Sequence, residues 1–282
     1  MPTLAYDIAD HLVCPESAGR LHALLEQHDA SSAQRPLTLR PIALGGQPIG
    51  LRPLPEDARA FVDAFVHRRA MPPAVLSEGQ TVLAIGAHVG FSCAMLLARD
   101  PGCRVFAVEH DDACVDQCRR NLGPFAARAT VLHAAAWGLS GAVHVTGNDE
   151  RSRRVHALGF YPDQPTPPSA ATGLTHALTV PAIMDRLGLD RVGLLHLDIN
   201  GAEAAVLDQT SPWLKRVDAA MVHVSAPASV EQIRWRLSEQ GMLVKHDPRD
   251  PSVLMALSRP LAEVQPRFPV PMHALDAPVG PG

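Results

Sequence analysis

The middle of this 282-residue chain alternates between short apolar segments and amphipathic ones, and this alternation limits the fold more than any other feature. The apolar segments are rich in β-branched residues and predict strands, while the segments between them have the apolar spacing of helices. Successive strand–helix units give a mostly parallel sheet with helices on both faces. The predicted elements, in chain order, are strand 81–85, helix 90–99, strand 104–109, helix 111–121, strand 130–134, strand 192–199, helix 201–209, strand 219–225 and helix 229–241.

The two ends of the chain do not follow this alternation. Near the start, "ESAGRLHALLEQHDA" has leucines at helical spacing, "LTLRPIALGGQPIGLRPL" predicts a hairpin, and "PEDARAFVDAFVHRRA" predicts a helix with its acids first. Near the end, "LVKHD" and "SVLMALS" predict an antiparallel hairpin. We therefore expect an N-terminal helix and hairpin extension over 1–55, one α/β domain over 56–258, and a proline-rich tail over 259–282.

Residues 147–173 interrupt the domain with a polar, proline-rich stretch. A long irregular insertion in a compact domain is usually a functional loop or a disordered one. We expect this loop, together with the N-terminal extension, to cover the substrate pocket. Its "DERSRR" run is interpreted as a solvated charged loop, the alternative being that Arg151, Arg153 or Arg154 meets an acidic group of the substrate.

Charge and cysteine usage narrow the expected partners and compartment. The net charge of -4 does not suit a nucleic-acid partner, and no apolar run approaches the roughly 20 residues of a membrane span. The N-terminus lacks the features of a secretory signal, and the 5 cysteines form no zinc-type pairs. We expect a cytoplasmic protein with a small-molecule acceptor and no nucleic-acid or membrane partner, and a homodimer is compatible with the sequence.

The stretch "TVLAIGAHVGFSC" (81–93) predicts a buried strand that runs into a glycine turn. Ligands of open α/β sheets lie at the carboxyl ends of the strands, so this turn is the candidate cofactor site. Gly86 and Gly90 depart from the spacing of dinucleotide-binding turns and resemble the G-x-G-x-G turn of class I methyltransferases, with His88 between them. Glu109 ends the next strand roughly 20 residues later, where an acid accepts hydrogen bonds from ribose hydroxyls.

Four stretches together resemble the FkbM family of S-adenosylmethionine-dependent methyltransferases. "TVLAIGAHVGFSCAMLLA" resembles D-I-G-A-N-x-G, "VFAVEHDDACVDQCRRNLG" the family's second strand and following helix, and "VLHAAAWGLSGAVHV" its third strand. The most specific match is "LLHLDINGAEAAVLDQ", which resembles K-I-D-V-E-G-A-E-x-x-V-L. The resemblance covers about residues 80–225. It implies a Rossmann-like class I fold, S-adenosyl-L-methionine as cofactor with S-adenosyl-L-homocysteine as product, and O-methylation of a secondary metabolite or sugar-like acceptor.

Several positions depart from these motifs. The first-strand acid is Ala84, the Asn that follows "GA" is His88, and the Glu before "GAE" is Asn200. In related enzymes the first-strand acid helps to hold the methionine end of the cofactor, and a ring N–H of His88 is the available replacement. The resemblance implies a cofactor site made of Gly86, Ala87, His88, Gly90, Glu109, His110, Ala136 and Asp198.

Methyl transfer requires the protein to align an oxygen nucleophile and to remove its proton. Because side chains alternate along a strand, His196 and Asp198 share one face of the fourth strand, and His223 ends the neighbouring one. We expect Asp198 and His223 to be the catalytic residues, with His223 as the general base, and we interpret His196 as a satisfied core histidine. A divalent metal at Asp198, Glu203 and His223 is an alternative, but the fifth strand lacks an acid pair and no metal is expected.

Two other functions remain open at this point. The losses at Ala84 and Asn200 are compatible with a catalytically inactive or repurposed binding protein on the same fold. A nicotinamide-dependent oxidoreductase would have a similar strand and turn, but the glycine spacing disfavours it.

Overall fold

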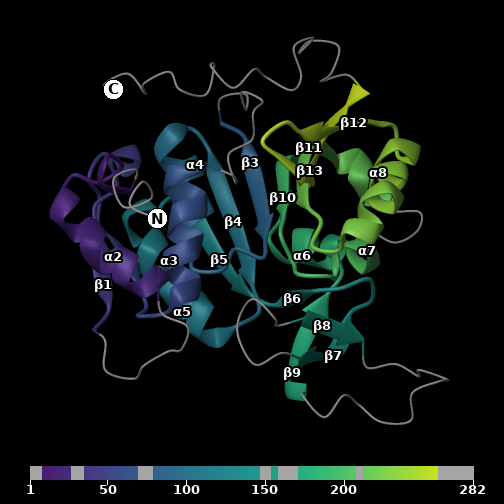
Figure 1. Ribbon diagram of the computed structural model, residues 1–282. Helices are drawn as coiled ribbons and strands as arrows, with labels where there is room; N and C mark the ends of the chain where they lie inside the picture. Colours follow the sequence, from purple (N-terminus) through teal and green to yellow (C-terminus); the bar gives the residue numbers. More distant parts are fainter. Residues whose placement is uncertain are drawn as a thin grey trace.

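The structure is a computed structural model that describes residues 8–26, 35–68, 79–146, 154–157, 171–207 and 212–259. Figure 1 shows a central sheet with helices packed beside it and a smaller sheet at one end. The expected tail over 259–282 lies outside the described residues apart from its first residue.

Seven strands form the central sheet in the order β12-β13-β11-β10-β3-β4-β5. The strands from β11 to β5 run parallel, whereas β13 runs antiparallel to both β11 and β12. The predicted mostly parallel sheet closed by an antiparallel hairpin is therefore confirmed. The strands are β3 (Thr81–Ile85), β4 (Arg104–Glu109), β5 (Ala129–His133), β10 (Val192–Leu197), β11 (Val217–His223), β12 (Met242–Asp247) and β13 (Asp250–Ser258).

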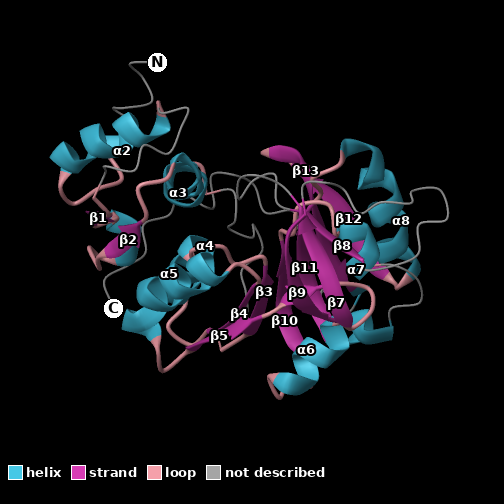
Figure 2. Ribbon diagram, turned by 90° about the horizontal axis from the view of Figure 1, so that it is seen from below, coloured by secondary structure: helices cyan, strands magenta, loops and turns pink. Residues whose placement is uncertain are grey.

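Helices cover both faces of this sheet, as Figure 2 shows. One face carries α4 (Phe91–Arg99) and α5 (Asp112–Leu122), and the other carries α6 (Val180–Arg186), α7 (Glu203–Val206) and α8 (Val230–Glu239). Successive residues of a strand point to opposite faces, so Leu194 and Leu195 belong to two different apolar cores. Among the described residues, no helix has the length and apolar composition that crossing a membrane requires.

The N-terminal elements pack on the α4–α5 face. They are α2 (Ala18–Leu25), an antiparallel hairpin of β1 (Leu37–Leu39) and β2 (Ile49–Leu51), and α3 (Pro55–Phe61), which continues into the π-helix η3 (Val62–Val66). The predicted helix and hairpin are confirmed. Short 3-10 turns complete the chain: η1 (Pro15–Ser17), η2 (Ile42–Leu44), η4 (Gly123–Phe125), η5 (Pro212–Arg216) and η6 (Pro227–Ser229).

A second sheet was missed by the sequence analysis. Its strands lie in the order β6-β9-β7-β8 and are β6 (Ala135–Ala136), β7 (Gly141–Thr146), β8 (Arg154–Ala157) and β9 (Ala171–Leu178). Because β8 and the start of β9 fall within 147–173, that insertion is not irregular throughout. Parallel pairing of β6 with β9 and antiparallel pairing of β7 with β8 and β9 form this sheet, and a scan for local periodicity does not detect such pairing. Arg151 and Arg153 lie outside the described residues, as does the side chain of Arg154.

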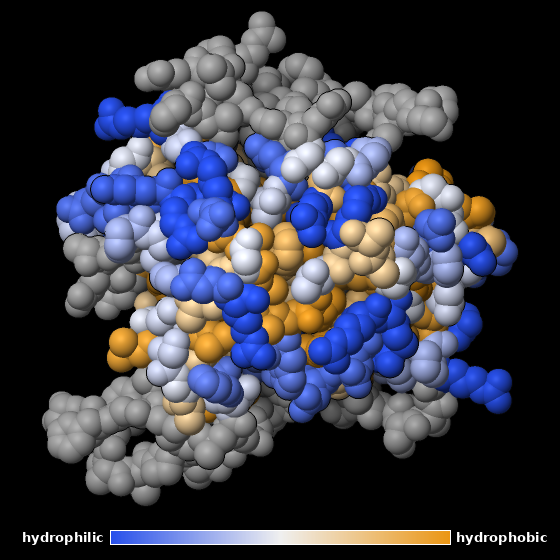
Figure 3. Space-filling view, turned by 180° about the vertical axis from the view of Figure 1, so that it is seen from behind, coloured by the Kyte–Doolittle hydropathy of each residue, from blue (hydrophilic) through white to orange (hydrophobic). Residues whose placement is uncertain are grey.

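Large apolar side chains on the described surface are few. On the face shown in Figure 3, an apolar area lies among hydrophilic side chains. The exposed large apolar residues are Val13, Ile42, Leu139, Trp235 and Leu243. Single exposed apolar residues are ordinary on folded proteins, so we assign them no function.

Candidate active site

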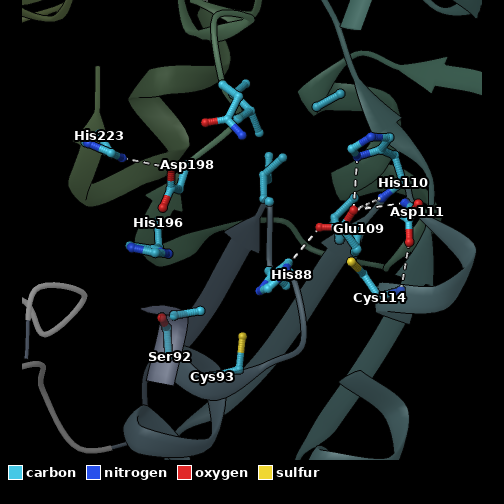
Figure 4. Close-up of a pocket in the computed structure, with 18 of the residues that line it drawn as sticks. His88, Ser92, Cys93, Glu109, His110, Asp111, Cys114, His196, Asp198 and His223 are labelled. Carbon is cyan, nitrogen blue, oxygen red and sulfur yellow. Dashed lines mark hydrogen bonds and ion pairs between the residues drawn. The ribbon is translucent and has the colours of Figure 1, made fainter. Parts of the chain in front are cut away.

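A cavity of about 300 Å³ lies at the carboxyl ends of the central strands β3, β4, β10 and β11. The glycine turn after β3, the end of β4, the end of β10 and His223 at the end of β11 all contribute to its lining. Figure 4 shows side chains from these strand ends turned toward the same space. The position agrees with the expectation for ligands of open α/β sheets.

The glycine turn has a backbone conformation that larger residues rarely adopt. Gly86 has a φ of 83° and Gly90 a φ of 84°. A Cβ on Gly86 would lie 1.8 Å from the carbonyl oxygen of Asp198, and one on Gly90 would lie 2.9 Å from Cys118 Sγ. The glycines therefore allow close packing of the protein against itself. Gly86, with its neighbours Ala87 and His88, lines the cavity, whereas Gly90 lies behind it at the start of α4.

His88 completes the turn and connects it to the N-terminal elements. It has a φ of 50°, a left-handed conformation that His and Asn tolerate better than most residues. Its Nε2 lies 3.4 Å from Arg52 Nη2 and 3.8 Å from Asp57 Oδ1. Asp57 is fully buried and also accepts hydrogen bonds from the backbone and side chain of Arg52. The ring of His88 thus faces a buried ion pair that the sequence analysis did not predict.

Glu109 ends β4 as a buried carboxylate in the cavity wall. Its oxygens accept hydrogen bonds from the backbone N–H groups of His88 at 2.9 Å, His110 at 2.7 Å and Asp111 at 2.9 Å. Burial alone would raise the pKa of Glu109, but the hydrogen bond and charge of His110, together with His88, lower it below the usual value. The carboxylate is therefore ionised at neutral pH and held rigidly by the backbone.

The other predicted residues of this half, His110 and Ala136, also line the cavity. His110 lines the cavity with its Nδ1 3.0 Å from Glu109, and its Nε2 is buried without a hydrogen-bond partner in the described structure. Ala136 lines the cavity beside Ala134 and Ala135. A charged acid, an orphaned ring nitrogen and a small apolar wall fit a polar, flat ligand such as a nucleoside.

Asp198 and His223 form a pair at the opposite side of the cavity, at the ends of β10 and β11. His223 Nδ1 lies 2.9 Å from Asp198 Oδ1, and both side chains are about half exposed, at 40% and 43%. The hydrogen bond to Asp198 outweighs burial and raises the pKa of His223 to about 9. Burial would raise the pKa of Asp198, but the hydrogen bond and charge of His223 lower it. At neutral pH the two residues are therefore an ion pair.

His196 is buried, as expected, but its ring lines the cavity rather than the core alone. The interpretation of His196 as a core histidine is therefore confirmed for its burial and corrected for its position, which is in the cavity wall.

The alternative metal site is not formed in the described structure. Glu203 is buried, and its Oε1 faces the backbone N–H groups of Gly201 at 3.1 Å and Ser225 at 3.3 Å. It thereby joins the segments that follow β10 and β11. No group of three potential metal ligands occurs among the described residues.

One wall of the cavity was not anticipated from the sequence. Glu56, Ala60, Asp63 and Ala64 line it from α3 and the π-helix η3. Their spacing places them on one helix face, but a helical pattern does not reveal which neighbour that face meets. Ser92, Cys93, Asp111, Cys114, Asn200, Met221, Asp250 and Val253 also line the cavity.

The sheet order, the antiparallel closing hairpin and a cavity across the carboxyl ends of the central strands define a Rossmann-like class I methyltransferase fold. The family model described as Methyltransferase FkbM domain matches residues 84–244, more than half of the chain. The chain therefore belongs to the FkbM methyltransferase family.

Solved structures of several methyltransferases are similar to this chain at low identity. Methyltransferase FkbM from Methylobacillus flagellatus KT is 13% identical, with 86% of this chain and 59% of that chain covered and a TM-score of 0.45. Precorrin-6y C5,15-methyltransferase from Geobacter metallireducens GS-15 is 13% identical, with 68% and 87% covered and a TM-score of 0.42. Aeropyrum pernix fibrillarin, solved with natively bound S-adenosyl-L-methionine, is 14% identical, with 66% and 67% covered and a TM-score of 0.39. A search of curated proteins found no match.

Proposed function

We propose that this chain transfers the methyl group of S-adenosylmethionine to a hydroxyl oxygen of a small molecule. The observation that carries the proposal is that Glu109 and the Asp198–His223 pair line one cavity, on either side of the glycine turn. Gly86, Ala87, His88, Glu109, His110 and Ala136 would hold the nucleoside part of the cofactor. When bound, the cofactor supplies an activated methyl group on a sulfonium.

The Asp198–His223 pair would receive the proton of the acceptor. As the acceptor oxygen bonds to the methyl carbon, the carbon–sulfur bond breaks, the sulfonium becomes a thioether and the hydroxyl proton must leave. His223 Nδ1 faces Asp198, so Nε2 would take this proton in molecules whose His223 is neutral, the minor form at neutral pH. Because the pKa of His223 is raised to about 9, its basic form increases as the pH rises toward that value.

The charge of the cavity favours an acceptor without phosphate groups. Six carboxylates line it: Glu56, Asp63, Glu109, Asp111, Asp198 and Asp250. A phosphate-rich acceptor such as nucleic acid would be repelled by these groups. A neutral or cationic hydroxylated molecule, such as a secondary metabolite or a sugar-like compound, is compatible with them.

Thermal unfolding with S-adenosylhomocysteine tests the cofactor part of the proposal. Ligand at about 100 times its dissociation constant should add about 2.7 kcal/mol to the free energy of unfolding. Glu109→Ala should remove most of this stabilisation, because it deletes the carboxylate at the nucleoside end of the cavity. A rise in the unfolding midpoint that survives Glu109→Ala would contradict the assignment of this acid.

An acceptor screen tests the reaction. Release of S-adenosylhomocysteine from S-adenosylmethionine should require a hydroxylated acceptor, and His223→Gln should reduce it strongly.

Ala84 and Asn200 are the observations that favour the rival proposal, a binding protein on the methyltransferase fold. That function predicts no transfer to any acceptor of a broad panel and, if the cofactor site is closed, no thermal shift with S-adenosylhomocysteine. A shift with a nicotinamide dinucleotide in place of S-adenosylhomocysteine would instead support an oxidoreductase.

A further inference from the structure

The ring of His196 is a buried polar group that faces the cavity without a protein partner. His196 lies in β10 and is only 6% exposed, yet it contributes to the cavity lining. Figure 4 shows it below Asp198, on the same side of the cavity. Within the described ranges its ring forms no hydrogen bond. Its nitrogens are open to the cavity, so a ligand that displaces water from the cavity has to pair with them, since an unmade hydrogen bond costs about 1–3 kcal/mol.

The two strands beside β10 explain why the ring has no partner. In register with His196 stand Ala84 of β3 and Met221 of β11, and neither side chain offers a strong hydrogen-bonding group. The motifs that this chain resembles have Asp at the position of Ala84 and Lys at the position of His196. The register makes these two positions neighbours, so this chain has a methyl group and an imidazole where those motifs would place an acid beside a base.

The charge state of His196 suits a partner that both donates and accepts hydrogen bonds. Burial lowers the pKa of His196, while the charge of Asp198 opposes this effect and that of His223 adds to it. The ring is therefore neutral at pH 7, with one N–H donor and one acceptor nitrogen. An α-amino acid group carries ammonium donors and carboxylate acceptors on one carbon, so it offers a partner to whichever ring nitrogen faces the cavity, donor or acceptor.

We propose that His196 binds the amino-acid end of S-adenosylmethionine, in place of the carboxylate that is absent at Ala84. This inference rests on the proposed function, because it takes S-adenosylmethionine as the cofactor. It differs from the sequence-based expectation, in which His88 replaces the lost acid. His88 instead faces the Arg52–Asp57 pair on the N-terminal side of the turn.

Two ligands that differ only at the amino-acid end test the proposal by isothermal titration calorimetry. S-adenosylhomocysteine carries that end, whereas 5′-methylthioadenosine keeps the nucleoside and the thioether sulfur without it. His196→Phe should weaken S-adenosylhomocysteine about 10- to 100-fold, the range for a hydrogen bond to a charged group. The same variant should bind 5′-methylthioadenosine as the unaltered protein does, and Glu109→Ala should weaken both ligands.

The controls separate binding from folding. Leu194→Met changes a buried residue on the same strand and face that does not line the cavity, and it should leave both affinities unchanged. His196→Gln keeps a donor and an acceptor and should retain most of the affinity for S-adenosylhomocysteine. If circular dichroism shows that His196→Phe does not fold, His196→Leu takes its place.

The other outcomes would contradict either the role of His196 or the proposed cofactor. Equal weakening of both ligands by His196→Phe, or weakening of neither, would overturn the role of His196 while the proposed function stands. If the unaltered protein binds neither ligand, the proposed cofactor is wrong and the role of His196 falls with it.

Discussion

At the scale of single residues, Asp198 determines the charge of His223. The carboxylate lies 2.9 Å from Nδ1 of the ring, and this hydrogen bond raises the pKa of His223 to about 9. A histidine whose pKa is higher in the folded protein than in the unfolded chain stabilises the fold while it is protonated. This contribution is complete below about pH 6.5, the unfolded value, and is lost as the pH rises through about 9.

Removing the charge of Asp198 should therefore lower the pKa of His223. We expect Asp198→Asn to move the His223 titration, followed by NMR of the ring protons, from about 9 toward its usual 6.5. The loss of stability between pH 7 and pH 10 should also be smaller in this variant than in the unaltered protein. Asp218→Asn removes the charge of an acid that pairs with Arg191, and it should leave the titration unchanged. An unchanged titration in Asp198→Asn would contradict the cause assigned to the shift.

The sequence reveals the residues of the site more readily than their partners. Glu109, Asp198 and His223 were predictable because each ends a strand and the carboxyl ends of parallel strands meet at one edge. The neighbours of His196 were not, because the register between β10 and β3 depends on how segments far apart in the chain pack together. His196 is buried, as interpreted, but for this reason its place in the cavity wall was not predicted.

At the scale of elements, α3 and the π-helix η3 line the cavity with one face and pack into the protein with another. One face lines the cavity, while Asp57 on another face is fully buried and holds Arg52 next to His88. The sequence predicted a helix over this stretch, since its acids come first and its bases last. It did not predict the wider π-turns, because the spacing of apolar residues does not distinguish them from α-turns in so short a segment.

Because the Asp57–Arg52 ion pair is buried, we expect a conservative substitution of Asp57 to lower the free energy of unfolding strongly. Asp57→Asn keeps the shape of the side chain but removes the buried negative charge that the Arg52 guanidinium contacts, and we expect a loss of about 3 kcal/mol in the free energy of unfolding. Asp116→Asn is the matched control, because the exposed Asp116–Arg119 pair should contribute less than about 1 kcal/mol. Urea unfolding measures both values. Equal losses in the two variants would contradict the expectation that the buried ion pair contributes more to the free energy of unfolding than the exposed one.

At the scale of the whole molecule, the N-terminal elements and the sheet share one apolar core. Leu21 of α2, Phe61 of α3 and Leu257 of β13 belong to the same buried cluster. The sequence divided the chain at residue 55, and that boundary stays a prediction. The shared core indicates that the extension and the domain unfold together.

Joint unfolding of the extension and the domain can be tested by changing a residue in the extension and following the unfolding of the domain. Leu21→Ala deletes a fully buried side chain in α2 and should cost about 2–5 kcal/mol. The change should lower the thermal midpoint seen by tryptophan fluorescence as much as the midpoint seen by circular dichroism, although Trp213 packs in the core on the other face of the sheet. Ile42→Ala, at a residue that is 56% exposed, should have little effect by either method. A fluorescence midpoint that does not move would mean that the extension unfolds separately.

The pairing of Ala84 with His196 has a consequence for how chains of this kind are compared. Along the sequence, Ala84 and His196 belong to separate motifs. A comparison with the family motifs made one position at a time therefore counts them as two independent differences. Across the sheet they are neighbours, so an acid at one position would face a base at the other, and replacing both together leaves no buried charge unpaired. A relative with Asp at the first position is therefore expected to have a cationic residue at the second, and substitutions at either position should be designed in pairs.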